Sequence, residues 1–375
     1  MNQLPKIGII YLTYPYAKWE LDINRCLTSL EKLNYPKEQL ELICVESKGK
    51  IDSIKGWFEK TWMPKSGKEL PNITYIYNDE WIGFSGNNNL GYLKAKELGC
   101  EFVHLTNEDT DVDPDYLLRA VERIQKDPAV ACVQSLILLG EERNKVNTVG
   151  NAFHYLGFGY SRGYRWTKEE ALKFFEEERK TNPDLEIGYA SGAAVLVRIS
   201  ALNDEPLFDE KFYSYHEDTD LSMRLRLRGL KTVVEPTSIL WHYYEFGKNR
   251  MNYYWMEKNR TILIWMYYRW PTLVLLLPIY IIMDLAILLF SVKGGWADLK
   301  LKVYKDWFSK DYRQWVWGRR KMLQQMRTVS DRAFLKPVVA DISFQEESVK
   351  NPLLDYVGNP LLRAYWAVVR RIIWW

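Results

Sequence analysis

Five carboxylates crowd into eight residues of the stretch HLTNEDTDVDPDYLLRAV, directly after an apolar run of the chain. Two of them, Asp109 and Asp111, stand two residues apart, so in an extended segment both side chains point to the same side. Their oxygens suit Mn²⁺ or Mg²⁺, which commonly bridge to substrate phosphates. Such a DxD pair is frequent by chance, and an acidic helix start or a solvated loop would also explain these residues.

The acids that follow fit a helix start. In DPDYLLRAV, Asp113 is expected to cap a helix that runs to Lys126, with Pro114 in the first helical position and Asp115 in the first turn. Negative charge is favourable there because the first amides of a helix lack partners and its dipole is positive. These two acids are therefore expected to be structural.

A second acidic group, in HEDTDLSMRLRLRG, could do acid–base chemistry. A positioned carboxylate can take the proton of an attacking hydroxyl, and Glu217 and Asp218 are the candidates. The plain structural explanation is again a helix start, with Asp218 or Thr219 as the cap and Arg224 and Arg228 on the solvent side. Helix-forming residues and a closing glycine favour a helix over a strand here.

The segments that would position these residues alternate between strands and helices. Short, nearly continuous apolar strands separated by helices predict an α/β fold with a mainly parallel sheet covered on both faces. In such sheets ligands bind beyond the carboxyl ends of the strands, which is where the acidic stretch falls. The expected strands are residues 6–14, 40–47, 73–79, 100–107 and 129–138, and the expected helices are 22–33, 85–99 and 115–126.

A run of small residues precedes a further apolar strand in GYASGAAVLVRISAL. Such a run permits close backbone approach, either by another element of the fold or by a ligand. On the second interpretation, Gly192 is a candidate acceptor contact. The four cysteines form no CxxC pair, which predicts buried reduced thiols.

Five segments, in the same order along the chain, resemble the motifs of family 2 inverting glycosyltransferases with the GT-A fold. NEDTDVDPDYL resembles the family's NNDTxVDPDWL, and EWIGFSGNNNLG is similar to NxGFAGGNNxG. FDEKFYSYHEDTDL resembles FDExFFxYxEDxDL, while LICVES and LWHYYEFG look like the segments that supply a nucleotide-binding carboxylate and a later histidine. The resemblance covers about residues 6–262. Glu46, Trp81 and Glu108 depart from the family pattern, which usually has Asp or Asn there.

The resemblance implies transfer of a sugar from a UDP- or dTDP-linked donor to an acceptor hydroxyl, with inversion. Asp109, Asp111 and His242 would hold Mn²⁺ or Mg²⁺, which would stabilise the departing diphosphate. Asp218 would be the general base and Glu217 would orient the acceptor. One base without an obvious second nucleophile favours a single displacement.

Donor recognition needs a cradle for the base and ribose. Thr13 and Tyr14, just past the first strand, and Glu46, just past the second, are the natural candidates. Asn89, in NNNLG, would hold the sugar or diphosphate through its amide, or it would simply fix the turn.

The chain changes in composition after about residue 262. Residues 293–375 carry 16 Lys and Arg against 8 Asp and Glu, although the whole chain has a net charge of only +3, so the first 292 residues are acidic. We therefore expect a GT-A catalytic domain over residues 1–262 and a helical, aromatic and basic membrane-associated region over residues 263–375.

Two segments of this tail indicate a membrane. Residues 270–292 are long and apolar enough to span a bilayer, but Pro278 and Asp284 interrupt them. Because the positive-inside bias opposes moving the basic tail across, a re-entrant hairpin or an in-plane helix pair bent at Pro278 is favoured over a single transmembrane segment. The last helix, over residues 359–375, has an apolar stripe opposite its arginines, as an interfacial helix does, unless it docks on the catalytic domain as a core helix.

The resemblance extends to rhamnosyl- and galactofuranosyl-transferases of surface polysaccharide assembly. It implies a lipid-linked glycan acceptor and a location at the cytoplasmic face of the cell membrane, where such acceptors lie. The membrane surface is then a further partner.

Two other functions stay open. A nucleotidyltransferase would share the sheet and the carboxylate pair, but no Gly-rich phosphate loop follows the first strand. A membrane-bound scaffold with a degenerate transferase fold would explain Glu46 and Trp81, but Asp109, Asp111 and Asp218 are intact. Nucleic acid is not an expected partner, because the basic excess is confined to an aromatic, apolar tail.

Overall fold

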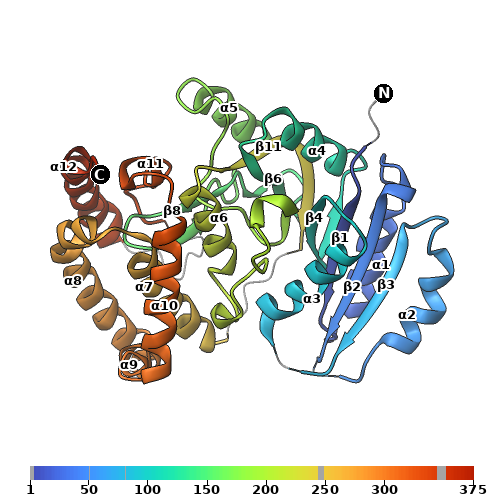
Figure 1. Cartoon of the computed structure of the whole chain (residues 1–375), viewed down its shortest axis with the longest axis horizontal. Coiled ribbons are helices and arrows are strands. Elements are labelled where there is room, and N and C mark those ends of the chain that lie inside the picture. The colour runs from blue at the N-terminus through green and yellow to red at the C-terminus, as the bar shows by residue number, and fades with distance from the viewer. Residues whose placement is uncertain (1–3, 50, 81, 244–248, 344–351) are drawn as a thin grey trace. The chain divides into compact units, whose positions relative to one another are not determined.

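The computed structural model describes residues 4–49, 51–80, 82–243, 249–343 and 352–375. Its main sheet has the strand order β3-β2-β1-β4-β10-β6-β11-β5, with β7 paired to β6, and β8 and β9 pair separately (Figure 1). The strands are β1 (Ile7–Thr13), β2 (Leu40–Ser47), β3 (Asn72–Asn78), β4 (Phe102–Asn107), β5 (Thr110–Val112), β6 (Val130–Leu139), β7 (Val146–Thr148), β8 (Asn151–Phe153), β9 (Gly159–Ser161), β10 (Ala194–Arg198) and β11 (Lys231–His242).

Parallel pairing brings the ends of β1, β2 and β4 to one edge of the sheet. Thr13 pairs in register with Glu46, and Leu12 pairs with Asn107. The residues that follow these strands therefore start from the same edge, as a parallel sheet requires. This edge carries the acidic stretch, since Glu108 directly follows β4.

The other half of the sheet is mixed. β10 runs antiparallel to both β4 and β6, whereas β6 and β11 are parallel, and the short β5 is antiparallel to β11. β6 and β11 end side by side, with Leu139 opposite His242. The predicted mainly parallel α/β fold is confirmed.

Helices cover both faces of the sheet because successive side chains of each strand point to opposite faces. On one face Ile9 belongs to the same core cluster as residues of α1 (Trp19–Leu30), α2 (Lys55–Thr61) and α4 (Tyr116–Lys126). On the other face α3 (Gly83–Glu97) packs so tightly on β1 that a Cβ at Gly91 would lie 2.5 Å from Ile10. The fifth helix, α5, is Lys168–Glu178. The four cysteines are free and buried, as predicted.

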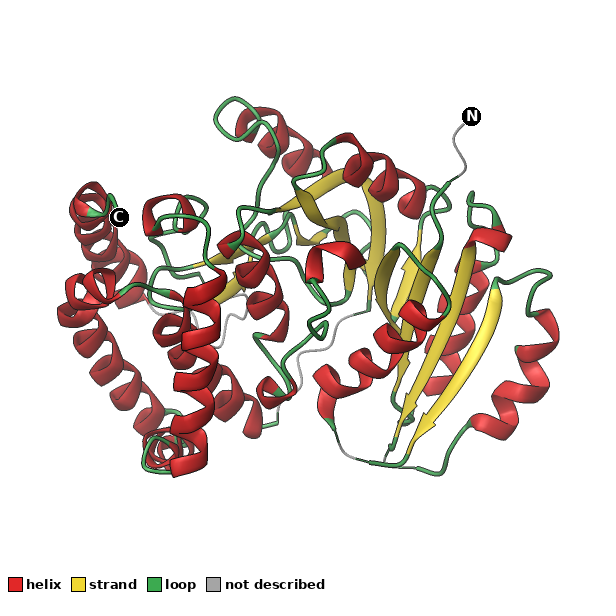
Figure 2. Cartoon of the chain, in the orientation of Figure 1, coloured by secondary structure: helices red, strands yellow, loops and turns green. Residues whose placement is uncertain are grey.

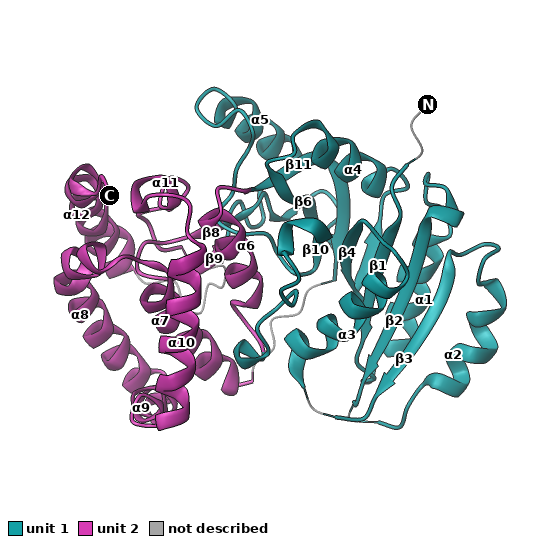
Figure 3. Cartoon of the chain, in the orientation of Figure 1, with its two compact units in different colours: residues 1–151, 161–213, 231–245 teal, residues 152–160, 214–230, 246–375 magenta. Residues whose placement is uncertain are grey.

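The chain forms two compact units, drawn in two colours in Figure 3. One contains the main sheet and the other is largely helical, as Figure 2 shows. Unit 1 comprises residues 1–151, 161–213 and 231–245, and unit 2 comprises residues 152–160, 214–230 and 246–375. The expected domain boundary at residue 262 is a functional division and stays a prediction.

Unit 2 gathers early and late segments of the chain. Its early segment is held to the end of the chain by hydrogen bonds from the Tyr155 hydroxyl to the Leu362 carbonyl (3.1 Å) and between His154 Nε2 and the Ala340 carbonyl (3.0 Å). Its helices are α6 (Glu217–Leu227), α7 (Met251–Tyr267), α8 (Trp270–Lys293), α9 (Ala297–Asp306), α10 (Lys310–Met326), α11 (Asp331–Phe334) and α12 (Asn359–Ile372).

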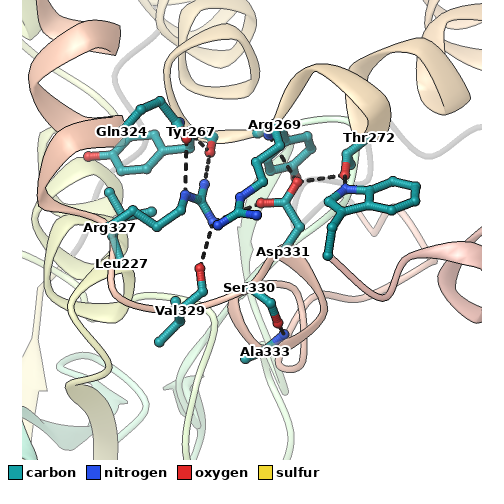
Figure 4. Close-up of polar contacts among 12 residues, drawn as sticks. Leu227, Tyr267, Arg269, Thr272, Gln324, Arg327, Val329, Ser330, Asp331 and Ala333 are labelled. Atoms are coloured by element: carbon teal, nitrogen blue, oxygen red, sulfur yellow. Dashed lines mark hydrogen bonds and ion pairs between the residues drawn. The ribbon is translucent and has the colours of Figure 1, made fainter.

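A buried ion pair joins the end of α10 to the start of α11. Arg327 and Asp331 point toward one another in Figure 4, 2.8 Å apart. The same carboxylate accepts hydrogen bonds from the Arg269 amide (2.9 Å) and the Thr272 hydroxyl (2.5 Å), at the start of α8. Asp331 therefore caps α8 from a distant part of the sequence.

The structure corrects the tail predictions in two places. α8 runs unbroken through Pro278, so the predicted hairpin or bent helix pair is wrong. Within the described residues, α8 is the helix long and apolar enough to cross a membrane. In α12 the stripe that contains Leu362 and Trp366 is buried, as in the core-helix alternative, whereas the neighbouring Leu361 and Val368 are exposed.

Candidate active site

The acidic stretch folds into a short turn and a strand rather than an open loop. After β4, residues Glu108 and Asp109 make the turn, and β5 then pairs with the end of β11. His242 lies opposite Thr110 and Trp241 lies opposite Asp111. Asp109 and Asp111 therefore flank Thr110, the residue that lies opposite His242.

Asp109 and His242 are in direct contact. A carboxylate oxygen of Asp109 lies 3.2 Å from Nε2 of His242. Burial alone would raise the pKa of Asp109, but the charge and hydrogen bond of His242 outweigh it, so this pKa is lowered. Asp109 is thus held in the ionised form that a cation would bind.

Asp111 is paired with groups that the sequence did not reveal as site residues. Nη1 of Arg143 lies 2.8 Å from its carboxylate, and the Tyr243 hydroxyl donates to the same oxygen (3.2 Å). The ring of Tyr243 packs where a side chain at position 140 would stand, which makes Gly140 necessary there. Arg143 follows β6 by four residues, at the same strand end as His242. Its place just after a predicted strand is the feature of the sequence that could have indicated it as a site residue.

Thr13 and Tyr14 contact the acidic turn from the end of β1. The Thr13 hydroxyl and the Tyr14 amide both donate to the carboxylate of Glu108. Burial raises the pKa of Glu108 to about 8, although these hydrogen bonds lower it. The structure thus brings together Thr13, Tyr14, Asp109, Asp111 and His242 in unit 1.

The side chains of Asp109, Asp111 and His242 supply part of the ligand set that a divalent cation needs. No group of three His, Cys, Asp or Glu side chains within the described ranges has the arrangement of a complete metal site. Asp109 and His242 nevertheless offer one carboxylate and one imidazole in contact, with the Asp111 carboxylate two residues along. A partial protein site of this kind fits Mn²⁺ or Mg²⁺, which take further oxygens from substrate phosphates.

Glu46 has its hydrogen bonds inside the protein. Its carboxylate is fully buried and accepts from the Ser53 hydroxyl (2.8 Å), the Ile54 amide (3.0 Å) and the Tyr75 hydroxyl. It therefore ties the end of β2 to the start of α2 and to β3. Its contact with a donor stays a prediction.

Asn89 and Gly192 also lie within the framework of unit 1. The amide of Asn89 donates to the Phe208 carbonyl and accepts from the Phe208 amide, both at 2.9 Å. It fixes the segment before Tyr213 onto α3. Gly192 lies buried in the turn that leads into β10.

Glu217 and Asp218 lie together in unit 2, in the first turn of α6. Glu217 is buried, and no hydrogen bond reaches one of its oxygens within the described residues, whereas Asp218 is half-buried. Burial, and then the charge of Asp218, raise the pKa of Glu217 well above its ordinary value. The raised pKa favours the protonated form of Glu217.

The turn that directly precedes Glu217 and Asp218 has a strained backbone. Tyr215 and His216 both have positive φ, at 65° and 67°, which β-carbon-bearing residues rarely adopt. Asn259 of α7 donates to the Ser214 carbonyl (3.1 Å) and the Tyr215 carbonyl (2.7 Å), which holds the turn in place. Such strain is concentrated at functional sites.

The predicted helix over this segment is confirmed, but two details are wrong. His216, not Asp218 or Thr219, occupies the cap position. Arg224 is buried rather than solvent-facing, since it pairs with the buried Asp220 at 3.0 Å. At the first acidic stretch, in contrast, the helix begins later than predicted: Asp115 is the cap residue, and the Asp113 carboxylate accepts from its amide (3.0 Å).

Glu217→Gln is expected to stabilise the protein more strongly at pH 8 than at pH 5. Because the folded-state pKa is raised, the unfolded chain loses a proton that the folded chain keeps, so stability falls as pH rises above the ordinary carboxyl pKa. Glutamine does not ionise, so this loss of stability at high pH disappears, and Tm at pH 8 should rise by a few degrees. Thermal melts at both pH values measure it. The exposed Glu69→Gln is the control, and an equal Tm change at both pH values would contradict the assignment.

Comparison with known proteins agrees with this architecture. A match to the model described as "Glycosyl transferase family 2" covers residues 10–204, just over half of the chain. An N-acetylglucosaminyl-diphospho-decaprenol L-rhamnosyltransferase of Mycobacterium tuberculosis is 32% identical over 78 residues. That match covers 21% of this chain and only a quarter of the relative's length.

Solved structures resemble the fold at low sequence identity. The mannosyltransferase PcManGT from Pyrobaculum calidifontis, in complex with GDP-Man and Mn²⁺, is 15% identical with a TM-score of 0.52, over 87% of this chain and 86% of that one. GalNAc-T7 with UDP, GalNAc and Mn²⁺ is 15% identical with a TM-score of 0.53, over 71% and 51% of the two chains. The fold is GT-A, and the chain belongs to glycosyl transferase family 2.

Proposed function

We propose that the protein moves a sugar from a UDP- or dTDP-linked donor to a hydroxyl of a lipid-linked glycan, with inversion and with a divalent cation, at the cytoplasmic face of a membrane. The observation that carries the proposal is the contact of Asp109 with His242, beside Asp111, at the carboxyl edge of the sheet. Ligands of open α/β sheets bind at this edge.

Asp109, Asp111 and His242 would hold Mn²⁺ or Mg²⁺. The ion, when bound, stabilises negative charge on the departing diphosphate. Thr13, Tyr14, Glu46 and Asn89 would shape the donor site, the last two by fixing the loops around it. Arg143, which now neutralises Asp111, is a further cation at the same strand ends.

On the acceptor side, Asp218 would take the proton of the attacking hydroxyl. Because its pKa is raised, Glu217 is favoured in the protonated form, which would donate a hydrogen bond to the acceptor and orient it. Gly192 would allow close approach of the acceptor. One base and no second nucleophile support inversion of the anomeric centre.

The exposed surface of α8 supports attachment to a membrane. Side chains along its whole length are largely exposed, including Val274 (66%), Ile282 (62%) and Leu289 (72%). Its one acid, Asp284, is turned inward, 2.6 Å from Nζ of Lys300 in α9. Because this ion pair holds the middle of α8 to its own unit, we expect α8 to lie in the plane of the membrane and not to cross it.

Attachment of this kind supports a lipid-linked acceptor. Acceptors on lipid carriers stay at the leaflet surface, so an enzyme held there meets them without leaving the membrane. The partial similarity to a transferase named for a diphospho-decaprenol substrate agrees with this acceptor class.

Asp109→Asn should lower sugar transfer on the order of 100-fold or more, because a cation ligand is lost. Wild-type protein is incubated with a panel of UDP- and dTDP-sugars and Mn²⁺, and released nucleotide is measured. EDTA should abolish release, and added Mn²⁺ should restore it in wild type only. The control, Asp52→Asn, removes an exposed carboxylate of the same unit. Full activity in EDTA would refute the metal, and release with no sugar in the panel would refute the transferase.

A further inference from the structure

Unit 2 has a cavity of about 690 Å³ at the start of α8. Its walls come from the start of α8, the second half of α10 and the last residue of the chain. Tryptophans and cations line it together, namely Arg269, Trp270, Trp317, Arg320, Lys321 and Trp375.

The cations of this cavity lack a carboxylate partner. In the part of the chain that the structure describes, the side chains of Arg269 and Lys321 make no hydrogen bond or ion pair. Arg320 is 6% exposed and donates to two backbone carbonyls, those of Trp265 and Tyr268. The nearby Asp331 is already paired with Arg327.

Among the described residues Arg320 has no carboxylate within ion-pair distance, although its guanidinium lies over the Trp270 ring, 4.5 Å from the centroid, and is attracted by the charge of Asp331. Its burial is still costly, because the guanidinium has lost hydration. Burial accordingly lowers the pKa of Arg320. An anion that entered the cavity would recover this cost by accepting hydrogen bonds from Arg320, Arg269 and Lys321. The electrostatics of the cavity therefore favour an anionic ligand.

The exposed tryptophans around the cavity favour an anion that carries acyl chains. Trp270 and Trp317 are stacked, with centroids 6.0 Å apart, and are 54% and 40% exposed. Trp374 is 75% exposed at the chain end, next to Trp375, whose indole donates to Thr272 of α8 (2.9 Å). Exposed tryptophans beside an apolar helix face are typical of the level where lipid headgroups meet acyl chains.

We propose that this cavity binds the phosphate of an anionic membrane lipid. Arg269, Arg320 and Lys321 contact the phosphate, and the acyl chains lie against Trp270 and the exposed side chains of α8. The inference rests on the proposed attachment of unit 2 to a membrane. It adds a specific headgroup site to what would otherwise be a general apolar attraction. A free phosphate has the same charge, but it leaves the tryptophans without a partner.

The double variant Arg269→Gln/Lys321→Gln tests the site without removing a hydrogen bond or an ion pair among the described residues. The full-length protein is titrated with dihexanoyl phosphatidic acid below its micelle concentration, so that no membrane surface contributes. The matched control is Lys60→Gln/Lys173→Gln, which removes two exposed, unpaired charges from the described part of unit 1. We expect one lipid per wild-type chain, roughly tenfold or weaker binding in the double variant, and binding within twofold of wild type in the control.

Three results would overturn the proposal. They are equal affinities of the double variant and the control, equal binding of dihexanoyl phosphatidylcholine, and displacement of the lipid by an equal concentration of inorganic phosphate. Sedimentation of wild type with vesicles of phosphatidylcholine and phosphatidylglycerol distinguishes membrane attachment from lipid binding in the cavity. If wild type does not sediment, the membrane attachment fails. If it sediments and the titration shows no difference between the variants, the cavity assignment alone fails.

Discussion

Asp218→Asn is expected to slow sugar transfer by about 100- to 10,000-fold while the protein remains folded. Asp218 is half-buried in the first turn of α6. Burial raises the pKa of its neighbour Glu217 well above the ordinary value, which favours Asp218 for the proposed role of base. Asparagine keeps the size of the side chain and can still accept from the Thr219 amide, now 2.7 Å from Asp218. Initial rates with the donor found in the nucleotide-release panel measure the effect.

The affinity for the nucleotide separates this role from a structural one. Asp218→Asn should bind donor nucleotide as wild type does, because the donor residues belong to a different part of the fold. Asp204→Asn is the control, since that carboxylate is 94% exposed and its ion pair is with the surface Lys96. Its rate should stay within twofold of wild type. A rate above one third of wild type in Asp218→Asn would remove Asp218 as the base.

Asp331→Asn is expected to cost about 3–5 kcal/mol of folding free energy, because it leaves Arg327 buried without its counter-charge. Both side chains of this pair are 2% exposed or less. The same carboxylate also caps α8 through the Arg269 amide and the Thr272 hydroxyl (Figure 4). The free energy of unfolding in urea measures the loss.

An exposed ion pair of the same unit supplies the comparison. Arg363 and Asp341 are 2.7 Å apart, but both are about half exposed. Asp341→Asn should therefore cost less than about 1 kcal/mol. If Asp331→Asn costs no more than this, the Arg327 guanidinium has found other partners or water, and the α8 cap is not essential.

Much of the sheet and the acidic turn could be predicted from short-range patterns. Apolar runs between helical segments located β1, β2, β3, β4 and β6 to within a residue or two, since buried parallel strands are apolar on both faces. The same logic placed Thr13, Glu46 and the acidic stretch at one edge, because parallel strands end together. The family motifs then assigned chemistry to residues that spacing alone left ambiguous.

The features that were missed depend on pairings that hydrophobic patterns and residue types do not reveal. An arginine on a helix is expected in solvent, but Arg224 is buried because Asp220, one turn earlier, neutralises it and Tyr267 binds the same carboxylate at 2.6 Å. Arg143 belongs to the site because β6 ends beside β11, and one sequence does not state that register. Pro278 removes one helical hydrogen bond. α8 nevertheless continues through it, helped by the anchoring of Asp284 to Lys300.

The apolar face of α8 has a practical consequence for handling the protein. Rows of leucine, isoleucine and valine side chains remain uncovered along 24 residues of helix, a patch larger than soluble monomers usually tolerate. In plain buffer these side chains would bury themselves against those of another molecule, so self-association should increase with concentration. A mild detergent that coats the helix should return the protein to single copies, since the Asp284–Lys300 ion pair keeps the helix attached to its unit.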